Sequence, residues 1–280
     1  MKVAIFGIGL IGGSAAKDLR AANFCSEILG VGRSQKSCDM ALELGLVDKI
    51  VSKDEAIAQA DLIILTVPVN ILIDELKYVL DRVQPDQVIT DMGSTKGIII
   101  DAIKDHPNRK QYVASHPMAG TENSGPSAAI FNLFKGKVCI ICDKENSNAD
   151  AVALIEQLYN TLGMRIKYMD AHQHDMHAAY ISHISHISSF VLAATVLEKE
   201  KDEEAILEMA GGGFESTVRL AKSSPEMWAP ILQQNKNYLL EVMETYIEKM
   251  YHFRNLINKN KNEELKEFMS SANEIRKILK

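Results

Sequence analysis

The chain has 280 residues, of which 46% are hydrophobic and 24% are charged, a composition typical of folded proteins and a length that suggests two domains. Its formal net charge of −6 provides no surplus of Lys and Arg for a nucleic-acid surface, so we expect no nucleic-acid partner. No apolar stretch approaches the about 18 to 20 residues that cross a bilayer, and a strand begins at Lys2, leaving no room for a signal peptide. We therefore expect a cytoplasmic protein without membrane contact.

The first apolar strand, residues 2–6, leads into a glycine-rich turn and then into a helix that starts near Ile11. Gly7, Gly9 and Gly12 have the GxGxxG spacing of dinucleotide sites. The first glycine permits a tight turn, the second lets backbone approach a pyrophosphate, and the third lets helix pack on strand. The phosphates would face the free N–H groups at the start of the helix. The segment predicts a dinucleotide site.

The second strand, residues 27–31, ends at Gly32, where an NAD site usually has Asp or Glu to hold the ribose 2′-hydroxyl. Arg33 and Ser34 follow instead. The guanidinium suits a phosphate, and a missing carboxylate removes a repulsive charge. This pattern favours NADP over NAD. The alternative is that Arg33 stacks over adenine or faces solvent, with NAD still accepted.

Strand-like and helix-like segments alternate up to residue 170. Residues 60–68 read as a strand buried on both faces, and we assign Thr66 and Pro68 at its end to the cofactor site. The other predicted elements are helices at 37–44, 69–82, 98–104 and 148–162 and strands at 87–91, 112–114, 137–142 and 165–169. The alternation predicts a doubly wound α/β domain over residues 1–170.

Two of these strands end in polar segments. Ser94 follows strand 87–91, and His116 follows strand 112–114. Ligands of open α/β sheets bind at the carboxyl ends of the strands. Imidazole titrates near neutral pH, so His116 is a candidate base. The alternative is that His116 only caps its strand or donates a structural hydrogen bond.

The cysteine pair Cys139 and Cys142 has CxxC spacing, but it lies in an apolar strand pattern. Side chains three apart on a strand point to opposite faces, and the chain has no second CxxC. We expect buried structural cysteines.

The remainder, residues 171–280, is predicted to be all helical. It contains five histidines, at His172, His174, His177, His183 and His186. On one continuous helix His174 and His183 lie about 180° apart, so the five cannot share a face, and we expect no metal site. Three glycines inside a helix would cost roughly 1 kcal/mol each, so Gly211 to Gly213 predict a special backbone shape. Arg219 is a candidate carboxylate ligand; the alternative is a surface ion pair.

Apolar stripes at helical spacing occupy the end of this region. They comprise Leu239, Met243, Tyr246, Met250, Phe253 and Ile257, followed by Leu265, Met269, Ala272, Ile275 and Leu279. Such stripes are usually core, but a short helical region this apolar also fits packing across a two-fold axis. We expect a homodimer through this region.

Together these motifs resemble the prephenate dehydrogenase family over nearly the whole chain. The matching segments are GIGLIGG at 7–13, DMGSTK at 91–96, HPMAGTE at 116–122, His174-Asp175, SHISH at 182–186 and GGGFESTVRLAK at 211–222. The first is shared by many dehydrogenases, whereas the third and the last together are far more specific.

The resemblance implies a Rossmann-type domain, residues 1–170, and an all-helical substrate and dimerisation domain, residues 171–280. It implies oxidative decarboxylation of prephenate to 4-hydroxyphenylpyruvate, with hydride transfer to NADP or NAD, in tyrosine biosynthesis. His116 matches the catalytic histidine that hydrogen-bonds the ring hydroxyl, and Ser94 the serine that orients it. Arg219 matches a carboxylate-binding arginine. The remaining substrate positions are His186, which matches a substrate-binding histidine, and His183 and Thr121, which match weaker positions in or behind the pocket.

Two departures from the family pattern matter: the missing acid after the second strand, and Ser185, where many relatives have proline. The chain has no room for a fused chorismate mutase or a regulatory domain, so we expect one function. The alternatives are an arogenate dehydrogenase, another β-hydroxyacid dehydrogenase, or a non-catalytic NADP-binding sensor whose helical half holds a partner.

Overall fold

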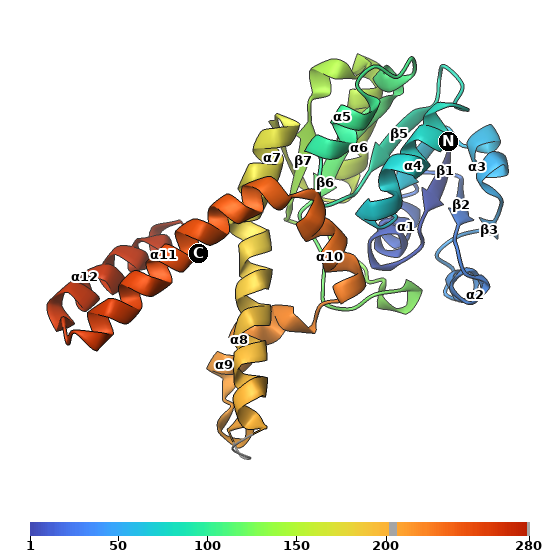
Figure 1. Ribbon diagram of the computed structural model, residues 1–280. Helices are drawn as coiled ribbons and strands as arrows, with labels where there is room; N and C mark the ends of the chain where they lie inside the picture. Colours follow the sequence, from blue (N-terminus) through green and yellow to red (C-terminus); the bar gives the residue numbers. More distant parts are fainter. Residues whose placement is uncertain (202–205, 279–280) are drawn as a thin grey trace. The chain divides into compact units, whose positions relative to one another are not determined.

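The computed structural model describes residues 1–201 and 206–278 (Figure 1). The chain forms two compact units, Met1–Asn235 and Lys236–Lys280. The first unit contains the sheet and all helices up to residue 234, and the second contains the helices that follow. The division into domains at residue 170 stays a prediction.

The first unit is built on one eight-stranded sheet with the order β3-β2-β1-β4-β5-β6-β7-β8. All neighbouring strands are parallel except β6 and β7, which are antiparallel. The strands are β1 Lys2–Phe6, β2 Glu27–Val31, β3 Lys49–Ile50, β4 Leu62–Leu65, β5 Val88–Asp91, β6 Tyr112–Pro117, β7 Val138–Cys142 and β8 Arg165–Met169. The strand order reverses between β1 and β4, the position at which such sheets bind ligands.

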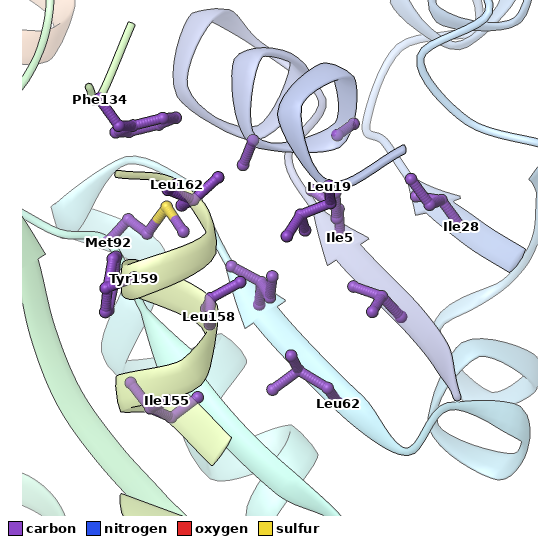
Figure 2. Packing of buried hydrophobic residues seen from close by; sticks show 14 of the residues in the cluster. Ile5, Leu19, Ile28, Leu62, Met92, Phe134, Ile155, Leu158, Tyr159 and Leu162 are labelled. Carbon is purple, nitrogen blue, oxygen red and sulfur yellow. The ribbon is translucent and has the colours of Figure 1, made fainter. Parts of the chain in front are cut away.

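Helices cover both faces of the sheet. They are α1 Leu10–Ala21, α2 Gln35–Glu43, α3 Lys53–Gln59, α4 Val69–Leu80, α5 Gly97–Ile103 and α6 Ala149–Thr161. One buried cluster joins α1, α2 and α6 to one face, and Figure 2 shows Ile155 and Leu158 of α6 packing towards Leu62 in this cluster. A second cluster joins α3, α4 and α5 to the other face. These layers confirm the doubly wound α/β fold.

Two details of this unit differ from prediction. Strand β6 continues past residue 114 to Pro117, because β7 pairs antiparallel with it and His116 lies opposite Ile140. His116 is therefore inside the strand rather than after it. Helix α3 was not predicted, although Ser52 and Glu55 form a capping box at its start.

The prediction for the cysteine pair is confirmed. Cys139 and Cys142 are both free and buried in β7. Cys139 belongs to the cluster on one face of the sheet and Cys142 to the cluster on the other. Burial also raises the pKa of both thiols far above the ordinary value, so both stay protonated.

After β8 the chain continues as one long helix, Ala171–Glu200. It consists of α7 Ala171–Ala178, a π-helical turn η4 Ala179–His183 and α8 Ile184–Glu200. By length and composition this helix could cross a membrane, so the expectation that no segment approaches that length is wrong. Scattered Ser, His and Thr residues interrupt its apolar runs, but the mean hydropathy of the helix stays as high as that of a membrane-spanning helix. One such helix is weak evidence of a span.

The rest of the first unit is η5 Leu207–Met209, α9 Gly212–Val218, η6 Arg219–Lys222 and α10 Pro225–Gln234. Gly211 precedes α9 and the next two glycines open it, none with a positive φ. The special backbone shape predicted for this run is therefore absent. Ser189 of α8 donates to Thr217 O at 3.0 Å and accepts from Ala221 N–H at 3.1 Å, which fixes α9 and η6 on α8.

The second unit consists of α11 Lys236–Asn258, α12 Asn262–Ala272 and η7 Asn273–Lys277. Phe268 of α12 packs edge-on against Phe253 of α11. Several predicted stripe residues of α11 are exposed in the single chain, including Tyr246, Met250 and Ile257. Leu279, the last member of the second stripe, lies outside the described residues.

Candidate active site

The glycine turn after β1 is packed tightly on two sides and open on the third. Gly7 has φ +95°, and a Cβ there would lie 2.7 Å from Thr66 O. A Cβ on Gly12 would lie 2.4 Å from Gly7 O. A Cβ on Gly9, in contrast, would meet nothing within 4 Å. The backbone at Gly9 is thus open to close approach by a ligand, which fits a pyrophosphate.

The other predicted cofactor residues lie beside this turn. Thr66 follows β4, and its Oγ1 lies 2.5 Å from Gly7 O. Gly9 precedes α1 without a side-chain cap, so the first N–H groups of α1, from Leu10 and the half-buried Ile11 onward, are available to an anion. Pro68 is exposed and precedes α4. The group fits a dinucleotide.

The end of β2 is open to solvent. Arg33 and Ser34 are exposed, and Ser34 caps α2 by accepting from Ser37 N–H at 3.2 Å. Arg33 has no ion-pair partner among the described residues. A Cβ on Gly32 would lie 2.6 Å from Cys38 Sγ, so an acid at position 32 would require Cys38 to move. The missing carboxylate is therefore part of the local packing.

His116 has a defined partner that the sequence did not reveal. Its Nδ1 lies 2.7 Å from Nε2 of His174, and Nδ1 of His174 lies 2.8 Å from Oδ1 of Asp175. Asp175 also accepts from the backbone N–H groups of Lys96 and Gly97, both at 2.8 Å, at the start of α5. The chain His116–His174–Asp175 thus joins β6, α7 and α5.

This geometry determines where the protons lie. An ionised carboxylate can only accept hydrogen bonds, so Nδ1 of His174 carries a proton and donates it in a hydrogen bond to Asp175. In the neutral ring, Nε2 of His174 then accepts from Nδ1–H of His116, which leaves Nε2 of His116 unprotonated. Burial holds the pKa of His116 well below its ordinary value of 6.5, and His174, Lys96 and His183 lower that pKa further. His116 is a neutral base at pH 7.

His183, in the π turn, has the opposite tautomer. Asn235 donates its two amide hydrogens to Asp175 O at 2.7 Å and to His183 Nδ1 at 3.0 Å. Because a backbone carbonyl can only accept, the amide nitrogen is assigned to this side. Nδ1 of His183 is therefore an acceptor, and Nε2 carries the proton. Burial lowers the pKa of His183 to about 4, so the ring is a neutral donor.

His186 and His183 both pack on Trp228, the single tryptophan of the chain. The His186 ring stacks on the indole with centroids 3.5 Å apart, and the His183 ring meets it edge-on at 5.8 Å. Nδ1 of His186 donates to Ser182 O at 3.1 Å, so Nε2 is unprotonated in the neutral ring. Burial lowers the pKa of His186, and the charge of Arg219 lowers it further.

Arg219 and Glu122 form the outer contact of this group. The guanidinium of Arg219 lies 3.7 Å from the Glu122 carboxylate, and both side chains are partly exposed. Glu122 belongs to the loop after β6, next to the half-buried Thr121, whose Oγ1 accepts from Asn123 N–H at 3.2 Å. The loop after His116 and the turn η6 therefore meet.

The segment after β5 is held firmly. Lys96 and Asp91 form an ion pair in which both side chains are fully buried. Asp91 also accepts from Tyr112 Oη at 2.7 Å and from Gly93 N–H at 2.8 Å. Ser94 is half-buried in this segment, and no hydrogen bond from it to His116 is found among the described residues. The predicted orienting role of Ser94 stays a prediction.

The structure thus connects most of the predicted substrate residues into one group. His116 is electrostatically coupled to His183, His183 and His186 share Trp228, and His186 lies near Arg219. Sequence reasoning missed His174, Asp175, Trp228 and Asn235 as parts of this group. It also placed His174 and His183 on opposite faces, because it assumed a continuous α-helix where the chain has a π turn. In the described part of the chain, no cluster of three or more His, Cys, Asp or Glu side chains could hold a metal.

Comparisons with known proteins match both the sheet region and the helical region of the chain. A family model described as prephenate dehydrogenase, nucleotide-binding domain, matches residues 15–168, and one described as prephenate dehydrogenase, dimerization domain, matches residues 170–271. Cyclohexadienyl dehydrogenase of Zymomonas mobilis is 32% identical over 99% of this chain and 96% of its own length. Prephenate dehydrogenase of Bacillus subtilis is 30% identical over 98% of this chain and 75% of its own length.

Among solved structures, prephenate dehydrogenase from A. aeolicus in complex with hydroxyphenyl propionate and NAD+ superposes with a TM-score of 0.92 at 29% identity. The superposition covers 100% of this chain and 98% of that one. The similarity therefore includes the sheet and the helices that follow it.

Proposed function

The chain belongs to the prephenate dehydrogenase family of NAD(P)-dependent enzymes, and on that premise we propose that it catalyses the oxidative decarboxylation of prephenate to 4-hydroxyphenylpyruvate. The observation that carries the proposal is the buried His116, which is joined through His174 to the carboxylate of Asp175. The A. aeolicus relative binds hydroxyphenyl propionate, a small molecule that carries both a ring hydroxyl and a carboxylate. His116 suits the hydroxyl and Arg219 the carboxylate.

The cofactor in this proposal is NADP, with NAD as the weaker alternative. Gly7, Gly9 and Gly12 would hold the pyrophosphate at the start of α1, with Ile11, Thr66 and Pro68 beside it. Arg33 and Ser34 are exposed, and the neighbouring residue, Gly32, has no carboxylate that would repel a 2′-phosphate. A bound nicotinamide supplies a two-electron hydride acceptor.

His116 acts on the hydroxyl of the ring carbon that loses hydride. Its Nε2 accepts the hydroxyl hydrogen as positive charge develops on that carbon. The ring carboxylate leaves as carbon dioxide, and the electrons of the broken C–C bond complete the aromatic ring. The proton returns from His116 to the phenol oxygen, so no net proton is released and His116 is neutral again.

The carboxylates of prephenate are held at the Arg219 side of this group. Arg219 offers a fork of donors to one carboxylate and exchanges Glu122 for it. His183 presents its Nε2 proton as a neutral donor. His186 binds a carboxylate only after taking up a proton, because its Nδ1 hydrogen is used by Ser182. Thr121 supplies a hydroxyl from the loop beside Glu122, and Ser94 assists His116 near the nicotinamide.

A spectrophotometric assay tests the proposal. Purified enzyme is mixed with prephenate or arogenate and with NADP or NAD, and reduced cofactor is followed at its absorbance band. We expect turnover with prephenate and a lower KM for NADP than for NAD. Turnover with arogenate alone would make it an arogenate dehydrogenase. Cofactor binding without turnover of either substrate would support a non-catalytic sensor.

The proposal includes a homodimer in the cytoplasm. The match to a dimerization domain supports self-association, and Tyr246, Met250 and Ile257 on α11 are exposed in one chain. Sedimentation at micromolar concentration tests the dimer, and a monomer there would contradict it.

A further inference from the structure

We propose that His174 is a positioning residue: anchored by Asp175, it keeps His116 in the tautomer whose Nε2 is unprotonated and shares the positive charge that develops on His116. This inference deepens the proposed function and rests on it for its kinetic part. The tautomer itself is a property of the unliganded protein and does not depend on the substrate.

The argument begins with the anchor. Asp175 receives three N–H groups, from Lys96, Gly97 and His174, each at 2.8 Å. The first two come from the backbone at the start of α5, so the carboxylate cannot turn away without uncapping that helix. Its side chain is 5% exposed, which limits competition from water. The direction of the hydrogen bond from His174 Nδ1 is therefore fixed.

The second step is the contact between the two rings. Their centroids are 5.0 Å apart at an interplanar angle of 71°, and the 2.7 Å contact runs from Nδ1 to Nε2. With Nδ1 of His174 already donating, its Nε2 is left to accept in the neutral ring. His116 must then carry its proton on Nδ1. The opposite tautomer would place two lone pairs against each other in a buried site.

The third step concerns charge. Burial disfavours a proton on His116 most strongly, and a charge on His174, Lys96 or His183 disfavours it further, so only a neutral His174 can support the proton that His116 takes up. His174 is the group through which a carboxylate can act on His116, because Asp91 is used by Lys96. As Nε2 of His116 takes the substrate proton, the hydrogen bond from His116 Nδ1–H to His174 becomes stronger. Asp175 then stabilises the positive charge through its own hydrogen bond with His174. This hydrogen bond therefore stabilises the transition state more than the resting state.

Two variants of His174 distinguish the role of its hydrogen-bond acceptor from the role of its side-chain volume. His174→Phe keeps an aromatic ring but cannot accept, and His174→Gln retains an amide oxygen that can. His177→Gln is the matched control, because His177 is exposed on the same helix. We expect His174→Phe to lower kcat about 10- to 100-fold, the usual effect of losing a hydrogen bond to a developing charge. KM for prephenate should change less than about threefold.

The conservative variant provides the rescue. We expect His174→Gln to recover most of the lost kcat, and His177→Gln to match the wild type. An unchanged kcat in His174→Phe would overturn the proposal. So would equal losses in the Phe and Gln variants, because a purely structural role predicts damage that an acceptor does not repair.

A spectroscopic test covers the case in which the variants do not fold. Wild-type protein labelled with ¹⁵N-histidine is measured without ligands, and His116 is assigned by the signal lost in His116→Gln. We expect a protonated Nδ1 and an unprotonated Nε2. A proton on Nε2 of His116 would overturn the proposal. Absence of turnover with prephenate and arogenate would instead defeat the proposed function, while this tautomer measurement would still stand.

Discussion

The two ends of the candidate site differ in how firmly they are built. At the base end, His116, His174 and Asp175 are 8%, 2% and 3% exposed and joined by hydrogen bonds of 2.7 and 2.8 Å. At the carboxylate end, the side chains of Arg219 and Glu122 are 56% and 33% exposed and 3.7 Å apart. Exposed ion pairs contribute little stability, because water competes for both charges. The base end is therefore ready before the substrate arrives, whereas the carboxylate end can rearrange around it.

The strongest test of the base end is His116→Ala. Removing a general base typically costs about 10²- to 10⁴-fold, so kcat should fall by that factor while the Kd for NADP stays unchanged. Steady-state kinetics and fluorescence titration of the cofactor measure the two quantities. His177→Ala is the control on an exposed histidine. A near-normal kcat would remove His116 from the chemistry.

The carboxylate end should respond in KM instead. Arg219→Ala removes a charged donor, and we expect KM for prephenate to rise about 10- to 100-fold with kcat reduced only a few-fold. Lys222→Ala is a matched control, because Lys222 lies in the same short helix and pairs with Glu215 at 3.8 Å. If KM stays the same, Arg219 does not bind substrate.

The exposed cofactor residue Arg33 should give a smaller effect. Arg33→Ala should raise the Kd for NADP about tenfold, the value of one charge-assisted hydrogen bond, and leave the Kd for NAD unchanged. Lys36→Ala removes an equal charge nearby and controls for the general field. An equal change for both cofactors would mean that Arg33 stacks on the adenine rather than binding a phosphate.

The pH dependence of kcat/KM tests the base end of the site without a substitution. The pKa of His116 lies well below 6.5 and that of His183 at about 4, so both rings stay neutral as the pH falls through 6.5. A proton on His116 removes the base, so the acid limb of kcat/KM should lie below pH 6.5. Stopped-flow rates from pH 5 to 9 measure it. A limb at or above 6.5 would contradict the burial argument.

Periodicity predicted most strands and helices of the sheet half of the molecule. The predicted strands at residues 2–6, 60–68 and 87–91 are apolar because parallel central strands are covered on both faces, and the structure has their central parts as β1, β4 and β5. The two-residue strand β3 and the short helix α3 were missed, because such short elements carry few periodic residues. Gly7, Gly9 and Gly12 were recognisable because each position needs an absent side chain for a separate reason.

The partners of His116 could not be derived in the same way. His174 reaches it across 58 positions of sequence, through the packing of α7 on α5. The π turn at Ala179–His183 rotates the later part of the helix, and no periodicity in the sequence announces it. Asn235 and Trp228 were equally hidden, since the position of each follows from tertiary packing alone.

The carboxylate of Asp175 has a consequence for anyone who redesigns this enzyme. It serves as the N-terminal cap of α5 and as the anchor of His174 at the same time. If His174 positions His116 as proposed, folding and turnover depend on this one side chain, and we expect a substitution there to alter both. Improvements in one property should be sought at neighbouring positions, because this position offers no independent adjustment of either.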